Sequence, residues 1–125
     1  MSRYLFDTDV IIEWLKSNEG VVERIKELIK TGAIIAWTPV SIAEIYAGIR
    51  DGEEGAVSEL FLVLEVLPLT EEVGKKAGKY LKSYTRSHGL EIADALIAGS
   101  ASHYKMKLWT LNRKRYPMSD IEIYL

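Results

Sequence analysis

Two aspartates of this chain stand where a carboxylate needs a specific reason to be. Asp7 directly follows the apolar run Tyr4-Leu5-Phe6, and every neighbour of Asp94 between Ile92 and Ala98 is apolar. A carboxylate in such surroundings must be paired, or it must change its protonation state. Each residue could instead serve a helix, because Asp is favoured at the cap and in the first turn. For Asp9, a helix cap is at least as good an explanation as catalysis.

A third acid, Glu44, has a stronger structural alternative. The tetrapeptide Ser41-Ile42-Ala43-Glu44 matches a capping box, in which a Ser cap and a Glu three residues later satisfy each other's backbone donors. Thr38 or Ser41 could cap the same helix without Glu44. Since this helix follows an expected strand, its first turn lies at the same end of the sheet as Asp7. Glu44 is therefore a candidate site residue, with the capping box left open.

Three carboxylates from separate segments repel one another unless a cation joins them. The chain has no Cys and two His, which excludes disulfides, thiolate catalysis and Cys-ligated zinc and disfavours a His-rich metal site. Oxygen ligands favour Mg²⁺ or Mn²⁺, which suit phosphate chemistry. We therefore predict that Asp7, Glu44 and Asp94 are the metal ligands and catalytic acids.

A polar and basic segment follows the expected strand 107–109. Thr110 and Asn112 could orient a metal ligand or a bound water, although turn chemistry explains them as well. The cations of the segment predict a phosphate-binding rim, or otherwise an exposed turn. These cations are Arg113, Lys114 and Arg115.

The composition predicts one ordinary domain spanning residues 1–125. Hydrophobic residues make up 48% of the chain and charged residues 27%, enough for a core and a soluble surface. The net charge of −2 argues against a surface coated with basic residues for passive nucleic-acid binding. The N-terminal sequence does not read as a signal peptide, and no apolar run approaches the roughly 18 residues of a membrane span. We expect a cytoplasmic protein without membrane contact.

Apolar runs and amphipathic segments alternate along nearly the whole chain. This alternation predicts an α/β domain with a mostly parallel sheet of four or five strands between helices. Strands are expected at 4–6, 33–37, 64–69, 107–109 and, at the edge, 121–124. Helices are expected at 10–16, with Asp9 as its cap, at 20–30, at 41–49, up to about 62, from the Thr70 cap to about 87, and at 92–104.

The candidate residues fall into four motifs whose order resembles that of a known family. The motifs are Leu5-Phe6-Asp7-Thr8-Asp9-Val10, Ser41-x-x-Glu44-x-x-x-Gly48, Asp94-Ala95-Leu96-Ile97-Ala98 and Thr110-x-Asn112-x-x-x-Tyr116-Pro117. Together they resemble the PIN-domain nucleases, and within them the VapC-type toxins of toxin–antitoxin pairs. The resemblance covers nearly the full chain.

The resemblance implies a three-layer α/β/α fold and an endoribonuclease activity that depends on Mg²⁺ or Mn²⁺. It also implies a homodimer and a neutralising antitoxin that enters the active-site groove. Asp7, Glu44 and Asp94 match the three core acids, and Thr110 and Asn112 match the polar positions after the fourth strand. Many PIN domains carry a fourth acid where this chain has Arg115, which leaves one versus two metal ions open.

Two other functions fit part of the pattern. The run Asp7-Thr8-Asp9-Val10-Ile11 is consistent with the nucleophile loop of phosphatases of the haloacid dehalogenase type, although the chain is short for a cap-bearing member. Arg115 in place of an acid permits a degenerate PIN scaffold that binds RNA or a partner without cleaving RNA. The RNA target and the antitoxin's identity are not determined by the sequence.

Overall fold

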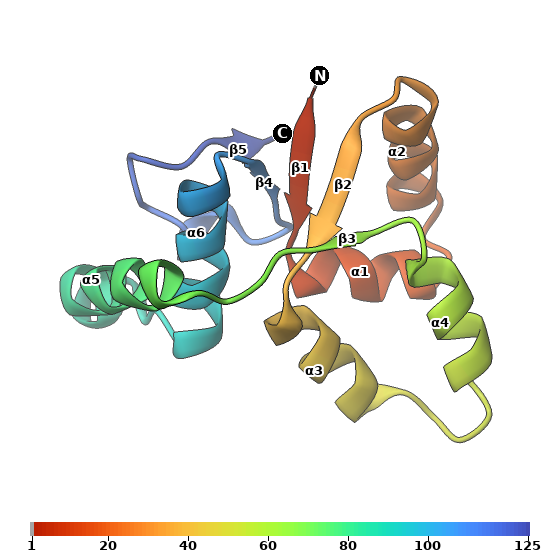
Figure 1. Ribbon diagram of the computed structural model, residues 1–125, viewed down its shortest axis with the longest axis horizontal. Helices are drawn as coiled ribbons and strands as arrows, with labels where there is room; N and C mark the ends of the chain where they lie inside the picture. Colours follow the sequence, from red (N-terminus) through yellow and green to blue (C-terminus); the bar gives the residue numbers. More distant parts are fainter. Residues whose placement is uncertain (1) are drawn as a thin grey trace.

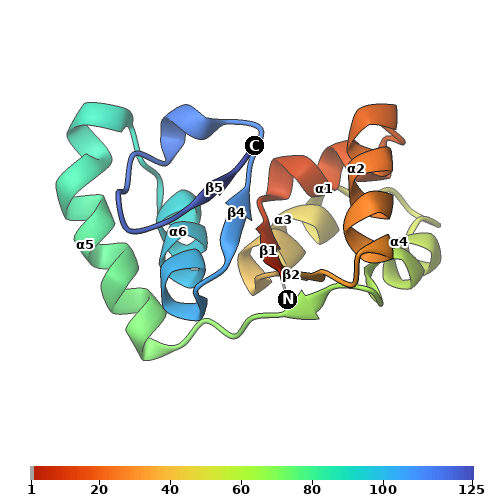
Figure 2. The same cartoon turned by 90° about the horizontal axis from the view of Figure 1, so that it is seen from above.

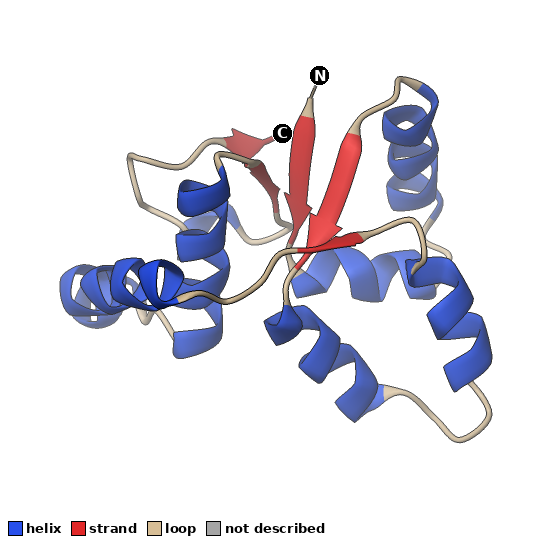
Figure 3. Ribbon diagram, viewed as in Figure 1, coloured by secondary structure: helices blue, strands red, loops and turns tan. Residues whose placement is uncertain are grey.

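A five-stranded sheet forms the centre of the protein in a computed structural model that describes residues 2–125. All strand pairings in the sheet are parallel, and the strand order is β3-β2-β1-β4-β5. Figure 3 shows the strands between two sets of helices. The predicted α/β class with a mostly parallel sheet is confirmed. The strands are β1 (Arg3–Phe6), β2 (Ile34–Trp37), β3 (Glu65–Val66), β4 (Lys107–Trp109) and β5 (Ile123–Tyr124).

Helices cover both faces of the sheet and complete the three layers. Helices α5 and α6 lie on one face, and α1, α2 and α4 lie on the other (Figure 2). The chain leaves the carboxyl end of β1 directly into α1 and the carboxyl end of β2 directly into α3 (Figure 1). The helices are α1 (Thr8–Leu15), α2 (Glu19–Lys30), α3 (Pro39–Gly48), α4 (Glu54–Phe61), α5 (Glu71–His88), α6 (Ile92–Tyr104) and the short 3₁₀ helix η1 (Arg113–Arg115).

The central strands β1 and β4 bury apolar side chains on both faces because each face packs on helices. In β1, Tyr4 and Phe6 join the core beneath α1 and α2, whereas Leu5 joins the core beneath α5 and α6. In β4, Trp109 and Leu108 divide in the same way. Successive side chains of a strand point to opposite faces, so a fully covered strand must be apolar throughout. Because β1 and β4 are parallel neighbours, their carboxyl ends lie side by side, and burial on both faces holds them there.

Helices α1 and α3 begin two residues earlier than predicted, and α2 begins one residue earlier. Helix α1 begins at Thr8, and its cap is Asp7, whose carboxylate accepts the Thr8 N–H at 2.8 Å. The prediction that Asp9 is the cap is therefore wrong, and Asp9 lies in the first turn. Helix α3 begins at Pro39 under a Thr38 cap, so Ser41 and Glu44 lie inside the helix and form no capping box. Proline suits the first helical position because its missing N–H would have no partner there.

The two edge strands are shorter than expected. Strand β3 has two residues where 64–69 was predicted, and β5 has two where 121–124 was predicted. Pro68 has no N–H to donate to a strand ladder, which limits β3 at its carboxyl side. Helix α5 follows the Thr70 cap as predicted and ends at His88, and the next residue, Gly89, adopts the left-handed conformation with φ +61°. No helix within residues 2–125 is both long and apolar enough to cross a membrane.

Candidate active site at the carboxyl ends of β1 and β4

Asp7 is a buried carboxylate held by three hydrogen-bond donors. Its backbone N–H donates to the carbonyl of Trp109 at 2.9 Å, which extends the β1–β4 pairing by one step. Its Oδ2 accepts from the hydroxyls of Thr110 and Tyr116, each at 2.8 Å, while Oδ1 accepts the Thr8 N–H. The residue is 8% exposed. These contacts fix the direction of the carboxylate, as a ligand or a general base requires.

Asp94 lies in the first turn of α6, and it is as buried as Asp7. Its Oδ2 accepts from the backbone N–H of Glu91 and from the Arg115 guanidinium, each at 3.3 Å. Its Oδ1 lies 3.5 Å from the hydroxyl of Tyr116, the same hydroxyl that donates to Asp7. One phenol therefore lies between the two carboxylates. Asp94 thus accepts a hydrogen bond at the start of α6 and also lines the cavity, so its place at the helix start does not exclude a role in the site.

Glu44 lies on the same cavity but is turned toward α1. Its Oε1 accepts from the hydroxyl of Thr8 at 2.7 Å, and that hydroxyl is also 2.8 Å from Ser41. Glu44 is exposed, whereas Thr8 and Ser41 are buried. Glu44 does not cap α3, and its hydrogen bond to Thr8 leaves the exposed side chain free to turn toward a ligand in the cavity.

Asp9 is the acid whose place in the site the sequence did not assign. Its Oδ2 accepts the Leu111 N–H at 3.1 Å and lies 3.5 Å from the Thr110 hydroxyl. Its Oδ1 is buried and has no hydrogen-bond partner. Asp9 thus holds the loop that carries Thr110, which in turn holds Asp7. The signal in the sequence that could have indicated this contact is the position of Asp9 two residues after Asp7.

These side chains surround a cavity of about 330 Å³ at the carboxyl ends of the strands. Asn112 and Arg115 reach it from the loop after β4, and the Thr110 hydroxyl accepts the Asn112 N–H at 3.0 Å. Arg113 is instead directed to the carbonyl of Leu125, and Lys114 is exposed outside the cavity lining. Of the three predicted cations, Arg115 alone lines this cavity. The lining also includes Asp7, Thr8, Asp9, Ile12, Glu44, Glu91, Ala93, Asp94 and Ile97.

Comparison with known proteins assigns the family. The model of the PIN domain family matches residues 4–120. The chain belongs to the PIN-domain family. Its relatives include Ribonuclease VapC10 of Mycobacterium tuberculosis, which is 34% identical over 117 residues, or 93% of this chain and 87% of that protein. Ribonuclease VapC19 of the same species is 30% identical over 115 residues, or 91% of this chain and 92% of that protein.

Solved structures share the fold of this PIN domain over nearly its whole length. The structure of VapBC-1 from nontypeable Haemophilus influenzae contains a chain that superposes with a TM-score of 0.80 at 23% identity, covering 98% of this chain and 96% of that one. A chain in the structure of FitAcB from Neisseria gonorrhoeae superposes with a TM-score of 0.75 at 25% identity, with the same coverage. The resemblance predicted from four motifs is therefore confirmed along the chain.

The acids of this PIN domain suit a divalent cation, although they do not form a complete metal cluster by themselves. No three acidic or histidine side chains among residues 2–125 converge into a ready metal site. Asp7 and Asp94 share one hydroxyl within hydrogen-bond distance, and Asp9 has a buried oxygen without a donor. Carboxylate oxygens and water are what Mg²⁺ prefers. The residues present therefore fit an ion held by two carboxylates and completed by water.

Burial sets the protonation of the acidic site in this PIN domain. Burial raises the pKa of the Asp7 carboxyl above its ordinary value, against the hydrogen bonds from Thr110 and Tyr116 that lower it. Burial and the neighbouring charge of Asp7 raise the pKa of Asp9 to about 6. Burial also raises the pKa of the Tyr116 phenol far above its usual range, so Tyr116 remains a donor at neutral pH.

We expect the metal-free protein to lose stability as the pH rises from about 4 to about 6. In the folded chain Asp9 keeps its proton up to a pKa of about 6, whereas its ordinary pKa is 3.8. Between these values the folded state binds more protons, so the free energy of unfolding falls with rising pH. The contribution is fully present below 3.8 and lost on passing 6. Urea unfolding in EDTA at several pH values should show a flatter profile for Asp9→Asn, and identical profiles would contradict this assignment.

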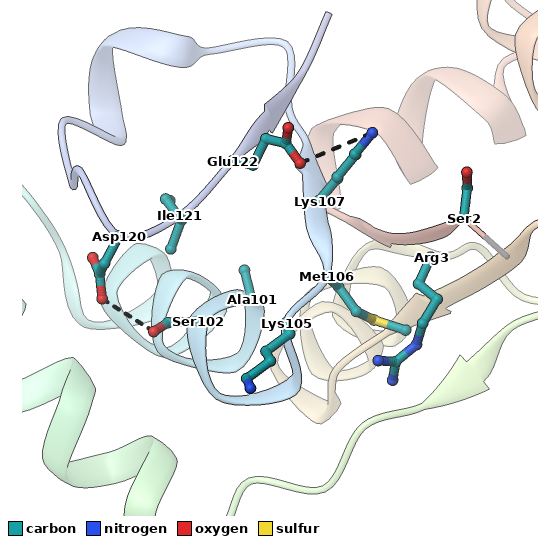
Figure 4. A pocket seen from close by; sticks show the side chains of 10 residues that line it. All are labelled: Ser2, Arg3, Ala101, Ser102, Lys105, Met106, Lys107, Asp120, Ile121 and Glu122. Carbon is teal, nitrogen blue, oxygen red and sulfur yellow. Dashed lines mark hydrogen bonds and ion pairs between the residues drawn. The ribbon is translucent and has the colours of Figure 1, made fainter.

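A larger cavity lies at the opposite end of the sheet, where β1 and β4 begin (Figure 4). It has a volume of about 430 Å³ and carries charges of both signs, several of which are already paired. Lys107 lies 3.9 Å from Glu122, and Asp120 accepts from the Ser102 hydroxyl at 3.0 Å. In the acidic cavity, Asp9 has a buried oxygen without a hydrogen-bond donor, whereas the acids of this second cavity, Asp120 and Glu122, have no such oxygen. The candidate active site of the PIN domain is therefore the acidic cavity.

Proposed function

We propose that this protein is a divalent-metal-dependent endoribonuclease and the toxin of a toxin–antitoxin pair. The observation that carries the proposal is the pair of buried carboxylates, Asp7 and Asp94, facing one cavity at the carboxyl end of a PIN-domain sheet. Relatives that share 34% and 30% identity over most of the chain are named ribonucleases. Parallel sheets bind ligands at this end. The reaction proposed is hydrolysis of an RNA phosphodiester bond.

The proposed ligands of the cation are Asp7 and Asp94, with Glu44 contributing directly or through water. Thr110 and Tyr116 hold Asp7 in a fixed direction through their 2.8 Å hydrogen bonds. Such outer contacts orient metal ligands and tune their basicity. A bound Mg²⁺ or Mn²⁺ would activate the attacking water and offset the negative charge that develops on the phosphate.

The remaining side chains of the cavity serve the RNA. Arg115 presents a half-exposed guanidinium, which suits a phosphate oxygen through its planar fork of donors. Asn112 reaches the same cavity and offers an amide to the sugar or phosphate. Arg113 and Lys114 lie on the adjacent turn, where exposed cations attract the backbone of RNA without reading its sequence. The products expected from the family resemblance carry a 5′-phosphate and a 3′-hydroxyl.

An apolar groove supports the proposal of an antitoxin partner. The groove has a volume of about 700 Å³ and runs between α1, α3 and α4. Ile12 and Glu44 line both this groove and the acidic cavity, so one bound segment could fill the groove and reach the acids. Its apolar walls suit the apolar face of a helix. Structural relatives include complexes titled VapBC.

A homodimer is proposed from the family resemblance, with the helices between Val57 and Tyr84 as its surface. Four large apolar side chains are exposed around the edge strand β3: Leu62, Val63, Val66 and Leu69. Leu62 is 83% exposed. Exposed apolar residues clustered on one edge of a protein are typical of an interface.

Cleavage of RNA in the presence and absence of metal tests the proposal. The purified chain should cleave a labelled, structured RNA with Mg²⁺ or Mn²⁺, should stop in EDTA, and should recover when excess Mn²⁺ is added. Analysis of the fragment ends should find 5′-phosphates. Cleavage that persists in EDTA would contradict metal dependence. RNA binding without cleavage at any metal concentration would favour the non-catalytic scaffold.

The phosphatase alternative is not supported. It rested on Asp7 and Asp9 as a nucleophile loop, but the Asp7 carboxylate is buried, and its three hydrogen bonds hold it in place and reduce its strength as a nucleophile. The PIN model spans residues 4–120, including all four motifs. The Asp-x-Asp spacing instead places Asp7 at the site and Asp9 beside the loop after β4.

A further inference from the structure

Arg115 and Asp94 form an unusual ion pair within residues 2–125. The Arg115 Nη1 atom lies 3.3 Å from Asp94 Oδ2, and the side chains are 45% and 11% exposed. Every other ion pair in the described part of the chain joins a carboxylate that is at least 31% exposed. Exposed pairs contribute little, whereas a buried carboxylate depends strongly on its partner. Asp94 thus depends on Arg115 more than a surface acid depends on its cation.

Asp94 has few other sources of positive charge. Its Oδ2 also accepts the Glu91 N–H at 3.3 Å, and its Oδ1 has only the Tyr116 hydroxyl at 3.5 Å. That hydroxyl has one proton, which it donates to Asp7 over the shorter distance of 2.8 Å. Four further carboxylates line the same cavity: Asp7, Asp9, Glu44 and Glu91. Arg115 is therefore the main counter-charge of Asp94.

The Arg115 side chain can leave this position without moving the backbone. It extends from the exposed end of η1, and the next residue, Tyr116, is 4% exposed and anchored in the core. Almost half of the Arg115 side chain is exposed to solvent. A long side chain with a free solvent path changes rotamer on a fast timescale.

We propose that Arg115 is a counter-ion that a divalent cation must displace from Asp94, and that the displaced guanidinium then binds the phosphate of the RNA. The inference rests on the proposed metal-dependent activity. In the metal-free protein, the guanidinium neutralises Asp94 and stabilises the acidic cavity. When the cation binds, the same guanidinium remains at the mouth of the cavity, one side-chain length from its former partner. Arg115 thereby has a role in both the metal-free and the metal-bound protein.

We expect opposite effects on metal binding and on RNA binding. Arg115→Met removes the competitor, so Mn²⁺ should bind the variant about three- to five-fold more tightly in the absence of RNA, the upper part of the range for one partly exposed ion pair. The same variant should have a several-fold higher KM for RNA at saturating Mn²⁺. Isothermal titration with Mn²⁺ alone measures the first effect, and initial cleavage rates measure the second.

Lys114→Met is the matched control. It removes a cation from the neighbouring position of the same 3₁₀ helix, but Lys114 does not line the cavity. Its Mn²⁺ affinity should stay within about two-fold of wild type, since only the screened long-range field changes. Equal gains for both variants would overturn the proposal, because the effect would then be general electrostatics. Weaker Mn²⁺ binding by Arg115→Met would overturn it too.

The outcomes also separate this proposal from the proposed function. Wild type that binds Mn²⁺ and cleaves RNA, with Arg115→Met unchanged in Mn²⁺ affinity, overturns the role of Arg115 alone. Absence of Mn²⁺ binding by wild type and by Arg115→Met overturns the metal site and the role of Arg115 with it. Circular dichroism and the melting temperature of each metal-free variant establish that the chains compared are folded.

Discussion

Asp94→Asn is expected to lower the rate of metal-dependent RNA cleavage at least about a thousand-fold, equivalent to about 4 kcal/mol of transition-state stabilisation. Asp94 is one of two buried carboxylates on the acidic cavity, and Asn removes its charge at nearly constant volume. The Asn oxygen can still accept the Glu91 N–H, so the start of α6 should persist. The loss should therefore appear in kcat with the fold intact.

Asp51→Asn is the control for Asp94→Asn. Asp51 is an exposed turn residue outside the cavity, and the substitution makes the same change of charge. Its cleavage rate should equal that of wild type. The measurement is the initial rate on one labelled RNA at saturating Mn²⁺, with circular dichroism of all three proteins. An Asp94→Asn protein that is folded and retains more than about a tenth of the rate would contradict the role of Asp94.

Gly99→Ala is expected to destabilise the protein by about 1–3 kcal/mol, the cost of overpacking a well-packed contact. Gly99 lies in α6 where α5 crosses it. A Cβ at this position would lie 2.9 Å from the carbonyl oxygen of Val73 and 3.3 Å from the nitrogen of Ala77. Because both atoms belong to the backbone of α5, the helices must separate to admit the methyl group. Urea unfolding at pH 7 measures the change in the free energy of unfolding.

Gly78→Ala provides a control of opposite sign. Gly78 is exposed on α5, and a Cβ there would contact nothing within 4 Å. Alanine has the higher helix propensity, so this variant should gain roughly 0.5–1 kcal/mol. Equal changes in the two variants would show that the α5–α6 contact does not restrict position 99. The contact matters for the site because α6 carries Asp94 at its first turn.

The sheet and its helices were predictable because the apolar patterns are long and regular. Strand β4 has the predicted bounds, and α6 begins and ends as predicted. The errors in the starts of α1 and α3 lie where two nearby residues offered the same local chemistry. Asp7 and Asp9 are both favourable N-cap residues. Because the buried strand β1 ends at Phe6, Asp7 is the first residue that can cap α1. At α3, Thr38 precedes Pro39 and starts the helix before Ser41 could.

The burial of Asp7 and Asp94 beside one cavity was predictable, because each is a charged residue in an apolar stretch of sequence. The contacts of Glu44 and Asp9 could not be read from the sequence, because each residue also fits a helix cap and its contacts depend on how α1, α3 and the loop after β4 pack together. Asp9, expected to be a cap, holds the loop at Leu111 instead. The assignment of Asp7, Glu44 and Asp94 as metal ligands stays a prediction.

Tyr116 shows a further limit of sequence analysis. Tyr116 follows three cations in the sequence, yet it is buried in the structure. Its hydroxyl nevertheless donates to Asp7 across 109 sequence positions. Such long-range contacts follow from the fold and leave no local pattern. The Arg115–Asp94 pair, which joins two segments 21 residues apart, is hidden for the same reason.

The central claim is that Asp7 and Asp94 together hold the divalent cation that cleavage requires. The most direct measurement is anomalous X-ray diffraction from crystals of the protein soaked in Mn²⁺. We predict an anomalous peak in the acidic cavity, within coordination distance of the carboxylates of both Asp7 and Asp94. A peak that lies only beside other acids, such as Asp120 or Glu122, or an empty cavity at saturating Mn²⁺, would contradict it.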